Sequence, residues 1–568
     1  MDEINLPASL ILFSVVALFS WPLGKYMSQV YSKQKSFSDF FEPVEDRIFK
    51  WLGIDPHAEM GLKQYLTAFL LLNLVWLVYA FFILLFQGDL MLNPAGNPSM
   101  DWTLALHSAI SFITSTNLQH YSGESGATYF SQLAVFTFLQ FVSASASLAV
   151  GVAVVRSLAK TDAGLGNFYF DFVRSATRIL FPLSVLVSVF FLFRGMPMTF
   201  DPAQQVVSMQ GDTTIVASGP VAAMISIKEL GSNGGGYYGT NDAHPFENPD
   251  QISFVIHYII VLLLPLAFVF FIGFYLKNHA FAKMIFAVMI AGFIMVCIPI
   301  IYQEIRGNPN IGAMGIDISG GNMEGKEVRY GSFYSALYAG ENASVPAGTI
   351  ASMHDSFMPL SGLFMLIAMQ IDCFFGGLGT GWINLFLYLV VAVFLGSLMI
   401  GRTPEVLGRK LGIREIQLAV IASVAQILVP MVLAGLACYV YNFDPAATND
   451  LGWLSNQGPH GLSTMFYEYV SSVAGNGSGF EGLGDNTPFW NLSTSLAMLT
   501  GRFVPIIAAL SIGWMLSKRK AVESTAGTLK VESTTFGIFL FLTIIILNAL
   551  SSFPVYALGP LSEYFSQQ

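Results

Sequence analysis

The amino-acid sequence predicts an all-α polytopic membrane protein with about ten transmembrane helices. Of the 568 residues, 54% are hydrophobic and only 11% are charged, whereas a soluble chain carries about a quarter charged residues. Apolar stretches long enough to cross a bilayer recur along the whole chain. In addition, one pattern occurs four times: a span, a short apolar segment and a cluster rich in small and polar residues.

Ten stretches have the roughly 20 apolar residues that a helix needs to span a bilayer. The seventh of them is interrupted by Gly376–Gly381, and six such residues do not continue a helix. We expect an intramembrane loop there, because a further crossing would move the basic segment 402–414 to the outer side. The stretches lie near 7–27, 62–87, 127–157, 168–193, 251–276, 284–303, 353–400, 416–442, 488–516 and 534–557.

The distribution of charge predicts the orientation in the membrane. If ten spans alternate from an external N-terminus, most of the 26 Lys and Arg residues fall on the inner side, as the positive-inside rule requires. The outer loops then carry a surplus of acids, which either concentrates cations at a pore mouth or only reflects the same rule. The net charge of −10 and the absence of a long basic run exclude a nucleic-acid-binding protein.

Four short apolar stretches are too brief to cross a bilayer and fit re-entrant helices. They cover 103–115, 219–231, 332–344 and 461–474, and the clusters 116–124, 232–241, 345–349 and 475–479 follow them. With Asn117, Asn233, Gly348 and Asn476 as markers, the spacing indicates one unit repeated four times around a pseudo-fourfold pore. We therefore predict a first span with a cytoplasmic segment (1–61), four pore repeats (62–160, 161–280, 281–414 with the interrupted helix 353–400, and 415–520) and a last span (521–568).

These units have the chemistry of a pore for a monovalent cation. A half-helix that enters from outside directs its C-terminal end, with its partial negative charge, towards the membrane interior. Glycines after it can adopt positive φ, so that successive carbonyl oxygens point into the pore and replace the hydration shell of the ion. Neutral amide oxygens could be added by Asn117, Gln119, Asn233, Asn241 and Asn476, which suit K⁺ better than a divalent ion. The alternative is that these clusters are plain turns.

Several long motifs resemble one family. The stretches TSTNLQHYSGE (114–124), GSNGGGYYGTNDAHPFENP (231–249), GNMEGKEVRYG (321–331), MHDSF (353–357) and IGRTPEVLGRKLGIREI (400–416) resemble the channel-like A subunit of the Kdp-type potassium-transporting P-type ATPase. The similarity extends over the whole chain. It implies a subunit of a multi-pass complex in the bacterial cytoplasmic (inner) membrane, which binds extracellular K⁺ and passes it through an intramembrane tunnel to a separate catalytic subunit.

The resemblance also implies partners and site residues. The partners are the catalytic P-type ATPase subunit, an accessory C subunit, a small F-type subunit and the lipid bilayer. A gate is expected at Arg402, with Gly377 and Gly379 of the interrupted span below the filter. The expected filter residues are Thr116, Asn117 and Gln119 in the first loop; Asn233, Gly234, Gly235 and Asn241 in the second; Ala347 and Gly348 in the third; and Asn476, Gly477 and Ser478 in the fourth.

The third loop departs from the family pattern. It reads Pro346-Ala347-Gly348 where the family usually has Ser-Cys-Gly. Proline lacks the N–H but keeps its carbonyl and fixes φ near −65°, so the oxygens that coordinate there are open. The fourth loop is one residue shorter than the family's.

Other functions are weighed against this one. The chain lacks the Asp-Lys-Thr-Gly phosphorylation motif of P-type ATPases, so no catalytic site and no nucleotide are expected. A haem-bearing subunit is disfavoured because only His257 lies within a span. A self-sufficient K⁺ channel or an ion-coupled symporter of the same superfamily stays open. Lys228–Glu229 is either a functional or a structural pair, and Asp372 is a functional candidate because of its depth.

Overall fold

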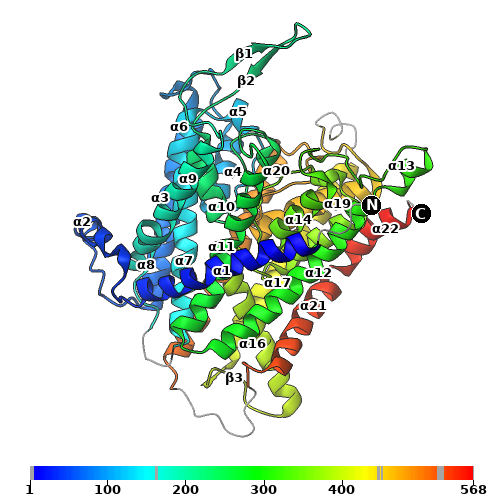
Figure 1. Cartoon of the computed structure of the whole chain (residues 1–568). Helices are drawn as coiled ribbons and strands as arrows, with labels where there is room; N and C mark the ends of the chain where they lie inside the picture. Colours follow the sequence, from blue (N-terminus) through cyan, green and yellow to red (C-terminus); the bar gives the residue numbers. More distant parts are fainter. Residues whose placement is uncertain (1–5, 160–163, 444–447, 449–451, 521–529, 567–568) are drawn as a thin grey trace.

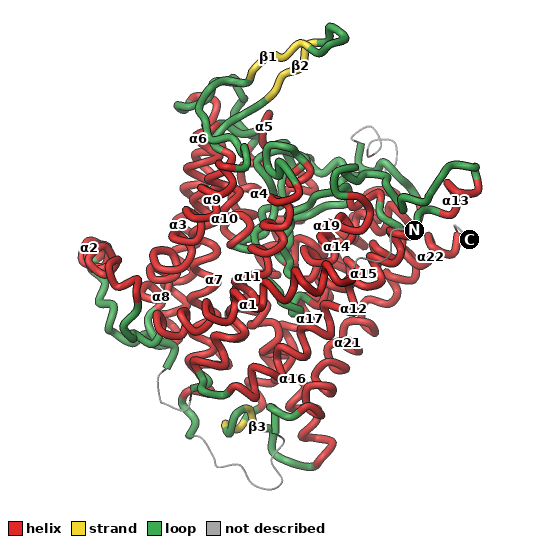
Figure 2. Tube along the Cα trace, in the orientation of Figure 1, coloured by secondary structure: helices red, strands yellow, loops and turns green. Residues whose placement is uncertain are grey.

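The computed structural model describes residues 6–159, 164–443, 448, 452–520 and 530–566. These residues form a helical bundle, with loops gathered towards one end (Figures 1 and 2). The predicted domain boundaries at 160–161 and 520–521 fall at gaps between the described residues, so the first lies outside them and the second at their edge.

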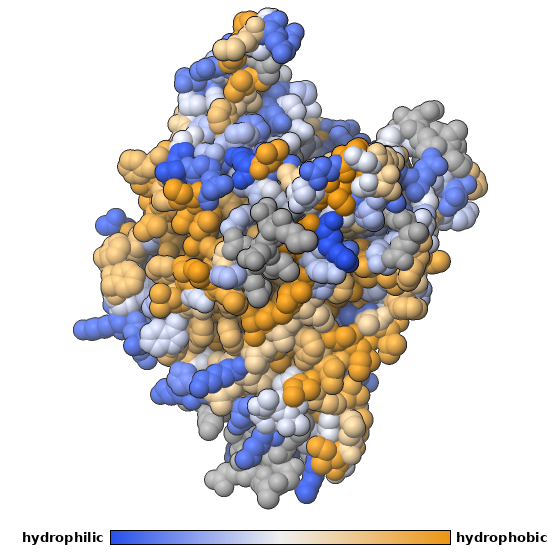
Figure 3. All heavy atoms as spheres, turned by 45° about the vertical axis from the view of Figure 1, so that its right-hand side comes forward, coloured by the Kyte–Doolittle hydropathy of each residue, from blue (hydrophilic) through white to orange (hydrophobic). Residues whose placement is uncertain are grey.

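Ten helical segments among the described residues are long and apolar enough to cross a membrane, which confirms the predicted number. Figure 3 shows the apolar surface that such a bundle presents to lipid, with polar residues gathered towards the two ends. The segments are α1 (Leu6–Tyr31), α3 (Leu62–Leu85), α6–η3–α7 (Tyr129–Ser157), α8–η4–α9 (Phe168–Phe193), α11 (Gln251–Tyr275), α12 with α13 (His279–Ala313), α16 (Thr380–Ile400), α17 (Ile413–Phe443), α20 (Pro488–Ser517) and α21–η7–α22 (Thr534–Ser566).

Four short helices lie between these spans and agree with the predicted re-entrant segments. Each packs against both neighbouring spans of its own repeat, for example α10 against α9 and α11. The side chain of Asp101 caps the first of them by accepting a hydrogen bond from the backbone N–H of Thr103. Short half-helices, buried along most of their length, therefore direct their C-terminal ends at the centre of the bundle. They are α4 (Trp102–Ile113), α10 (Val221–Leu230), α14 (Gly331–Ser344) and α19 (Gly458–Ala474).

The seventh span is interrupted, as predicted. The helix α15 (Pro359–Ile371) ends at Asp372, whose φ of 44° is left-handed, and α16 begins at Thr380. The break therefore starts four residues earlier than the glycine run Gly376–Gly381 suggests, and the last two residues of that run are already helical. The most enclosed spans among the described residues are Tyr129–Ser157, α11 and α16, and α16 begins where the break ends.

The remaining elements lie at the ends of the bundle. An antiparallel hairpin, in which Gln204 pairs with Val216, projects from the end of the bundle at the top of Figure 1. Both faces of its first strand are exposed, so no alternation of apolar residues announced it. The further elements are η1 (Phe37–Phe41), α2 (Glu42–Leu52), η2 (Gln87–Asp89), α5 (Gly123–Gly126), β1 (Gln204–Val207), β2 (Thr213–Val216), η5 (Asn241–Ala243), η6 (His354–Ser356), β3 (Glu405–Val406) and β4 (Arg409–Lys410).

Candidate ion-binding site

The four re-entrant helices end in the same kind of turn. In each repeat one backbone N–H beyond the helix donates to the carbonyl oxygen five residues earlier, at 2.9–3.1 Å. This hydrogen bond is that of a Schellman motif. Because it recurs in every repeat, this bond identifies one structurally equivalent residue in each. In the first repeat this residue directly precedes the marker Asn117, and in the third it directly precedes the marker Gly348. The equivalent residues are Thr116, Asn233, Ala347 and Asn476, bonded to Ser111, Lys228, Asn342 and Ser471.

Proline changes the third of these turns. Ser115, Ser232 and Gly475, which precede the equivalent residue in the other repeats, have φ between 50° and 69°. Pro346 takes this position in the third repeat, and its ring excludes a positive φ. The hydrogen bond from Ala347 to Asn342 is nevertheless made, at 3.0 Å. The substitution therefore alters the backbone conformation of the turn while its closing hydrogen bond stays in place.

The loops meet at their glycines. A Cβ atom added to Gly234 of the second loop would collide with the carbonyl oxygens of Thr116 in the first loop and Asn476 in the fourth. A Cβ atom on Gly348 of the third loop would collide with the same carbonyl oxygen of Asn476. Gly477 has a φ of 95° and lies against the carbonyl of Thr116. Carbonyl oxygens and glycines of all four repeats thus share one narrow space, which only residues without a side chain can line.

The sequence suggested that the amide side chains turn their oxygens towards that space. In the structure not all of them do so, and they hold the loops together. Gln119 of the first loop forms a double hydrogen bond with the backbone of Gly236 in the second: its Oε1 accepts from the N–H at 2.7 Å and its Nε2 donates to the carbonyl at 3.1 Å. The Oδ1 of Asn233 accepts from the hydroxyl of Ser115 at 2.7 Å. The amide of Asn117, by contrast, is buried and has no partner among the described residues.

Two further amides connect the second, third and fourth loops. The Nδ2 of Asn241 donates to the carbonyl oxygen of Gly348 at 3.4 Å, and the Nδ2 of Asn476 donates to the carbonyl of Asn342 at 3.0 Å. The Oδ1 of Asn476 is occupied by the backbone N–H of Ser478, at 2.9 Å. Backbone carbonyls are therefore left as the main oxygens that face the space between the loops.

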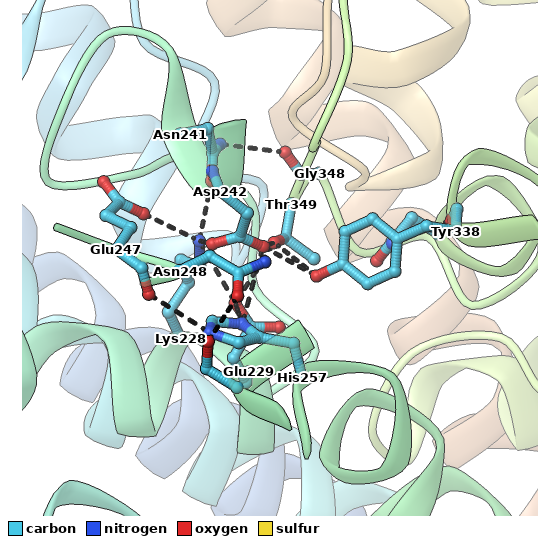
Figure 4. Close-up of polar contacts among 12 residues, drawn as sticks. Lys228, Glu229, Asn241, Asp242, Glu247, Asn248, His257, Tyr338, Gly348 and Thr349 are labelled. Carbon is cyan, nitrogen blue, oxygen red and sulfur yellow. Dashed lines mark hydrogen bonds and ion pairs between the residues drawn. The ribbon is translucent and has the colours of Figure 1, made fainter. Parts of the chain in front are cut away.

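A buried ionic cluster lies behind the second and third loops (Figure 4). The ammonium of Lys228, on α10, contacts four side-chain oxygens at 2.6–3.2 Å, and all of these side chains are buried. They belong to Asn241, Asp242, Glu229 and Glu247. The pKa of Asp242 is lowered: burial acts to raise it, but the charges of Lys228 and His257 outweigh burial.

This cluster also reaches the third repeat. The carboxylate of Asp242 accepts hydrogen bonds from the hydroxyls of Tyr338, at 2.6 Å, and of Thr349, which follows Gly348. Figure 4 shows both side chains pointing at Asp242, on the side opposite Glu247. The pair Lys228–Glu229 thus belongs to a network that fixes the second loop to the third.

A cavity of about 30 Å³ lies directly beneath the loops. A space of this size holds a water molecule or a dehydrated cation. Residues of all four loop entrances line it, together with the break in the seventh span and α20; they include Ser115, Ser232, Pro346, Gly475, Asp372, Gly377, Asn384 and Arg502. The cavity is therefore lined by the turns that follow the four short helices.

An acidic and a basic side chain face this cavity. The Oδ2 of Asp372 accepts a hydrogen bond from Asn384 at 2.6 Å, while its Oδ1 has no partner among the described residues. The guanidinium of Arg502 donates to the carbonyl of Ser143, at 3.3 Å, and to the hydroxyl of Ser147 on α7 (Phe138–Ser157). One carboxyl oxygen of Asp372 thus has no hydrogen-bond partner among the described residues at the wall of the cavity.

The three predicted gate residues do not lie together: two of them lie at the cavity and the third does not. Gly377 lines the cavity, and Gly379, with a φ of 78°, packs against the backbone of Ser147 beside it. Arg402 follows α16, is exposed, and does not contact the cavity. Arg502, by contrast, lines the cavity. The sequence analysis assigned Arg502 no role, although it lies within the predicted span 488–516 and an arginine within an apolar span is itself a functional signal.

Comparisons with known proteins agree with this architecture. The family model described as "Potassium-transporting ATPase A subunit" matches residues 10–565. A potassium-transporting ATPase potassium-binding subunit of Flavobacterium psychrophilum is 47% identical over 98% of this chain and 99% of its own length. One of Bacteroides thetaiotaomicron is 44% identical over 97% of this chain and 98% of its own length. The crystal structure of the potassium transporter TrkH from Vibrio parahaemolyticus covers 88% of this chain and 97% of its own with a TM-score of 0.52; at 16% identity it shows a shared fold alone.

Proposed function

Because this chain belongs to the family of potassium-transporting ATPase A subunits, we propose that it is the potassium-binding and translocating subunit of an ATP-driven uptake complex. In this proposal the complex lies in the bacterial cytoplasmic membrane, with the N-terminus of this chain outside. Its partners are a catalytic P-type ATPase subunit, which alone uses ATP, and the accessory C and small F-type subunits.

The observation that carries this proposal is the meeting of the carbonyls of Thr116 and Asn476 with Gly234 and Gly348. Uncharged carbonyl oxygens can replace the hydration shell of a weakly hydrated monovalent cation, whereas a divalent cation prefers carboxylates. The four half-helices add the negative ends of their dipoles at the same place. We propose that K⁺ is selected there.

We propose that the ion next enters the cavity beneath the filter. The free oxygen of Asp372 offsets the cost of bringing a cation to this depth. The fixed positive charge of Arg502 disfavours a straight path to the inner side, so that an ion is diverted along the membrane towards the catalytic subunit. The tunnel to that subunit is part of the proposal, and Gly377 lies where it would begin.

Reconstitution in liposomes tests the function. We expect the chain to purify with a stoichiometric partner that carries the Asp-Lys-Thr-Gly motif, and the complex to accumulate ⁸⁶Rb⁺ or K⁺ only with ATP. If the isolated chain moves K⁺ at a comparable rate without ATP, it is a self-sufficient channel or a symporter and the proposal is wrong.

A further inference from the structure

Three donor atoms meet at the seam between the first filter loop and the fourth repeat. The Nε2 of His120 lies 3.2 Å from the Oε1 of Glu468 and 3.9 Å from the Oδ2 of Asp485. All three atoms lie within 4.8 Å of one another. His120 follows Gln119, Glu468 lies on α19, and Asp485 lies between the fourth loop and α20. The set therefore links two repeats that are far apart in the sequence.

The separations suit the coordination shell of a transition metal. Zinc binds histidine nitrogen at about 2.0–2.1 Å and carboxylate oxygen at about 2.0–2.2 Å in tetrahedral geometry, which places neighbouring donors about 3.3 Å apart. The measured 3.2 Å and 3.9 Å bracket this value. Small side-chain shifts would bring all three donors to bonding distance and leave a fourth position for water.

The imidazole is oriented for such a role by a neighbour on α20. The Nδ1 of His120 lies 2.7 Å from the Oδ1 of Asn491, and a proton assigned to Nδ1 leaves the Nε2 lone pair facing the two carboxylates. A hydrogen bond of this kind to the second ring nitrogen is usual for histidines that bind metals.

A second histidine lies against the first. The ring of His107 stacks on that of His120 with the centroids 3.8 Å apart. His107 is fully buried, and neither of its ring nitrogens has a hydrogen-bond partner among the described residues. An unpartnered imidazole at this depth costs free energy unless water or a ligand contacts it, so the seam holds buried polar atoms that the described residues do not satisfy.

Access is from the side of the filter loops. The side chain of Asp485 is 29% exposed, whereas those of His120 and Glu468 are almost fully buried. An ion can therefore reach the set past Asp485 without passing through the filter.

A second set of three potential metal ligands is already occupied by the ammonium group of a lysine. Glu229, Asp242 and His257 also bring three donor atoms within 4.8 Å. The ammonium of Lys228, however, lies 3.1 Å from Glu229 and 2.7 Å from Asp242 and repels a further cation. No lysine or arginine contacts His120, Glu468 or Asp485 in the ion pairs of the described residues.

We propose that His120, Glu468 and Asp485 bind a divalent transition-metal ion such as Zn²⁺ and thereby clamp the first filter loop to the fourth repeat. Imidazole and carboxylate donors with an open fourth position are the set that zinc uses where it keeps a water ligand. The site is separate from the proposed K⁺ path and does not depend on it.

Equilibrium dialysis of the chelator-treated intact complex against Zn²⁺ tests the proposal, at constant K⁺ and with bound metal determined by mass spectrometry. We expect one Zn²⁺ per chain and a higher melting temperature. Asp485→Asn, which keeps the side-chain shape, should weaken Zn²⁺ binding about 100-fold, since even loss of an outer partner of a metal ligand costs about 10–100-fold. Glu468→Gln should do the same.

Two controls separate this site from others. Asp212→Asn removes an exposed acid of the β1–β2 hairpin, and His460→Asn removes the imidazole that pairs with Asp355 and Glu563; both should bind Zn²⁺ like the wild type. The proposal is overturned if the wild-type complex binds no Zn²⁺, or if Asp485→Asn and Glu468→Gln both retain full affinity. K⁺ binding measured on the same samples shows separately whether the proposed function holds.

Discussion

Single glycines determine how closely the four loops approach one another. Gly234 lies between the carbonyl oxygens of two other repeats, so a methyl group there must displace one of them. Selectivity for an ion of one size depends on where such oxygens lie. We therefore expect the proposed filter to be most sensitive to substitution at a residue that has no side chain.

Gly234→Ala should weaken K⁺ activation of the ATPase in the complex at least about tenfold and relax discrimination between K⁺ and Na⁺, because a shifted carbonyl costs about 1.4 kcal/mol or more of ion binding. The matched control is Gly435→Ala on α17, where an added Cβ meets no atom within 4 Å. K⁺ activation at limiting K⁺ is the measurement. Equal behaviour of the two variants would show that the second loop does not coordinate the ion.

Lys228 compensates three buried carboxylates behind the filter. Lys228→Met should lower the free energy of unfolding by about 3–5 kcal/mol, because removing one partner of a buried ionic group leaves uncompensated charge. Lys63→Met, at the exposed start of α3, should change it by less than about 0.5 kcal/mol. Thermal unfolding of the two purified complexes compares them, and similar melting temperatures would mean that the network does not stabilise the loops.

At the scale of elements, the interrupted seventh span lines the cavity beneath the proposed filter. The left-handed Asp372 ends α15 and brings its carboxylate into the cavity, across which α20 presents Arg502. A continuous helix would instead fill this space with apolar side chains. The interruption therefore allows an acidic and a basic side chain to line the cavity beneath the four loops.

Arg402 and Arg502 are the two candidates for the gate residue. We predict that Arg502→Ala changes the K⁺ dependence of transport several-fold, because it removes the positive charge that faces the cavity. Arg402→Ala should leave this dependence unchanged, because Arg402 is exposed beyond α16. Initial rates of ATP-driven ⁸⁶Rb⁺ uptake against Rb⁺ concentration measure both. The opposite ranking would restore the assignment made from the motif IGRTPE.

The elements could be predicted from the sequence far better than their contacts. The pore helix predicted at 219–231 is Val221–Leu230, because the length and hydropathy of a segment limit what it can do in a bilayer. The partners of its polar residues could not be predicted in this way. Asn241 was expected to coordinate the ion with its oxygen, yet Lys228 occupies that oxygen, and the contact between His120 and Glu468 joins residues 348 positions apart.

At the scale of the whole molecule, charged contacts tie the last residues of the chain to the filter repeats. His460, at the start of α19, donates to Asp355 beyond the third loop at 2.8 Å and to Glu563 on α22 at 3.0 Å. Burial acts to lower the pKa of His460, but hydrogen bonds to these two carboxylates outweigh it and raise the pKa to about 10. The third repeat, the fourth repeat and the last span are thus joined at one imidazolium.

This contact gives stability a defined pH dependence. Because the pKa of His460 is raised in the folded state, the stabilisation is complete below about pH 6.5 and is lost as the pH rises through about 10. Its loss should cost about 1.5–3 kcal/mol, the range for hydrogen bonds to charged groups. Melting curves from pH 6.5 to 10 should fall more steeply for the wild type than for His460→Gln; parallel curves would contradict the assignment.

The proposed function requires that the four loops bind K⁺ between their backbone carbonyls. Its most direct test is a structure of the complex with Tl⁺ or Rb⁺ in place of K⁺, in which the heavier ion is located by its anomalous signal. We predict a peak between the carbonyl oxygens of Thr116 and Asn476, beside Gly234 and Gly348. If a complex saturated with Tl⁺ or Rb⁺ shows no peak there, or shows peaks only outside the four loops, K⁺ does not bind between these carbonyls.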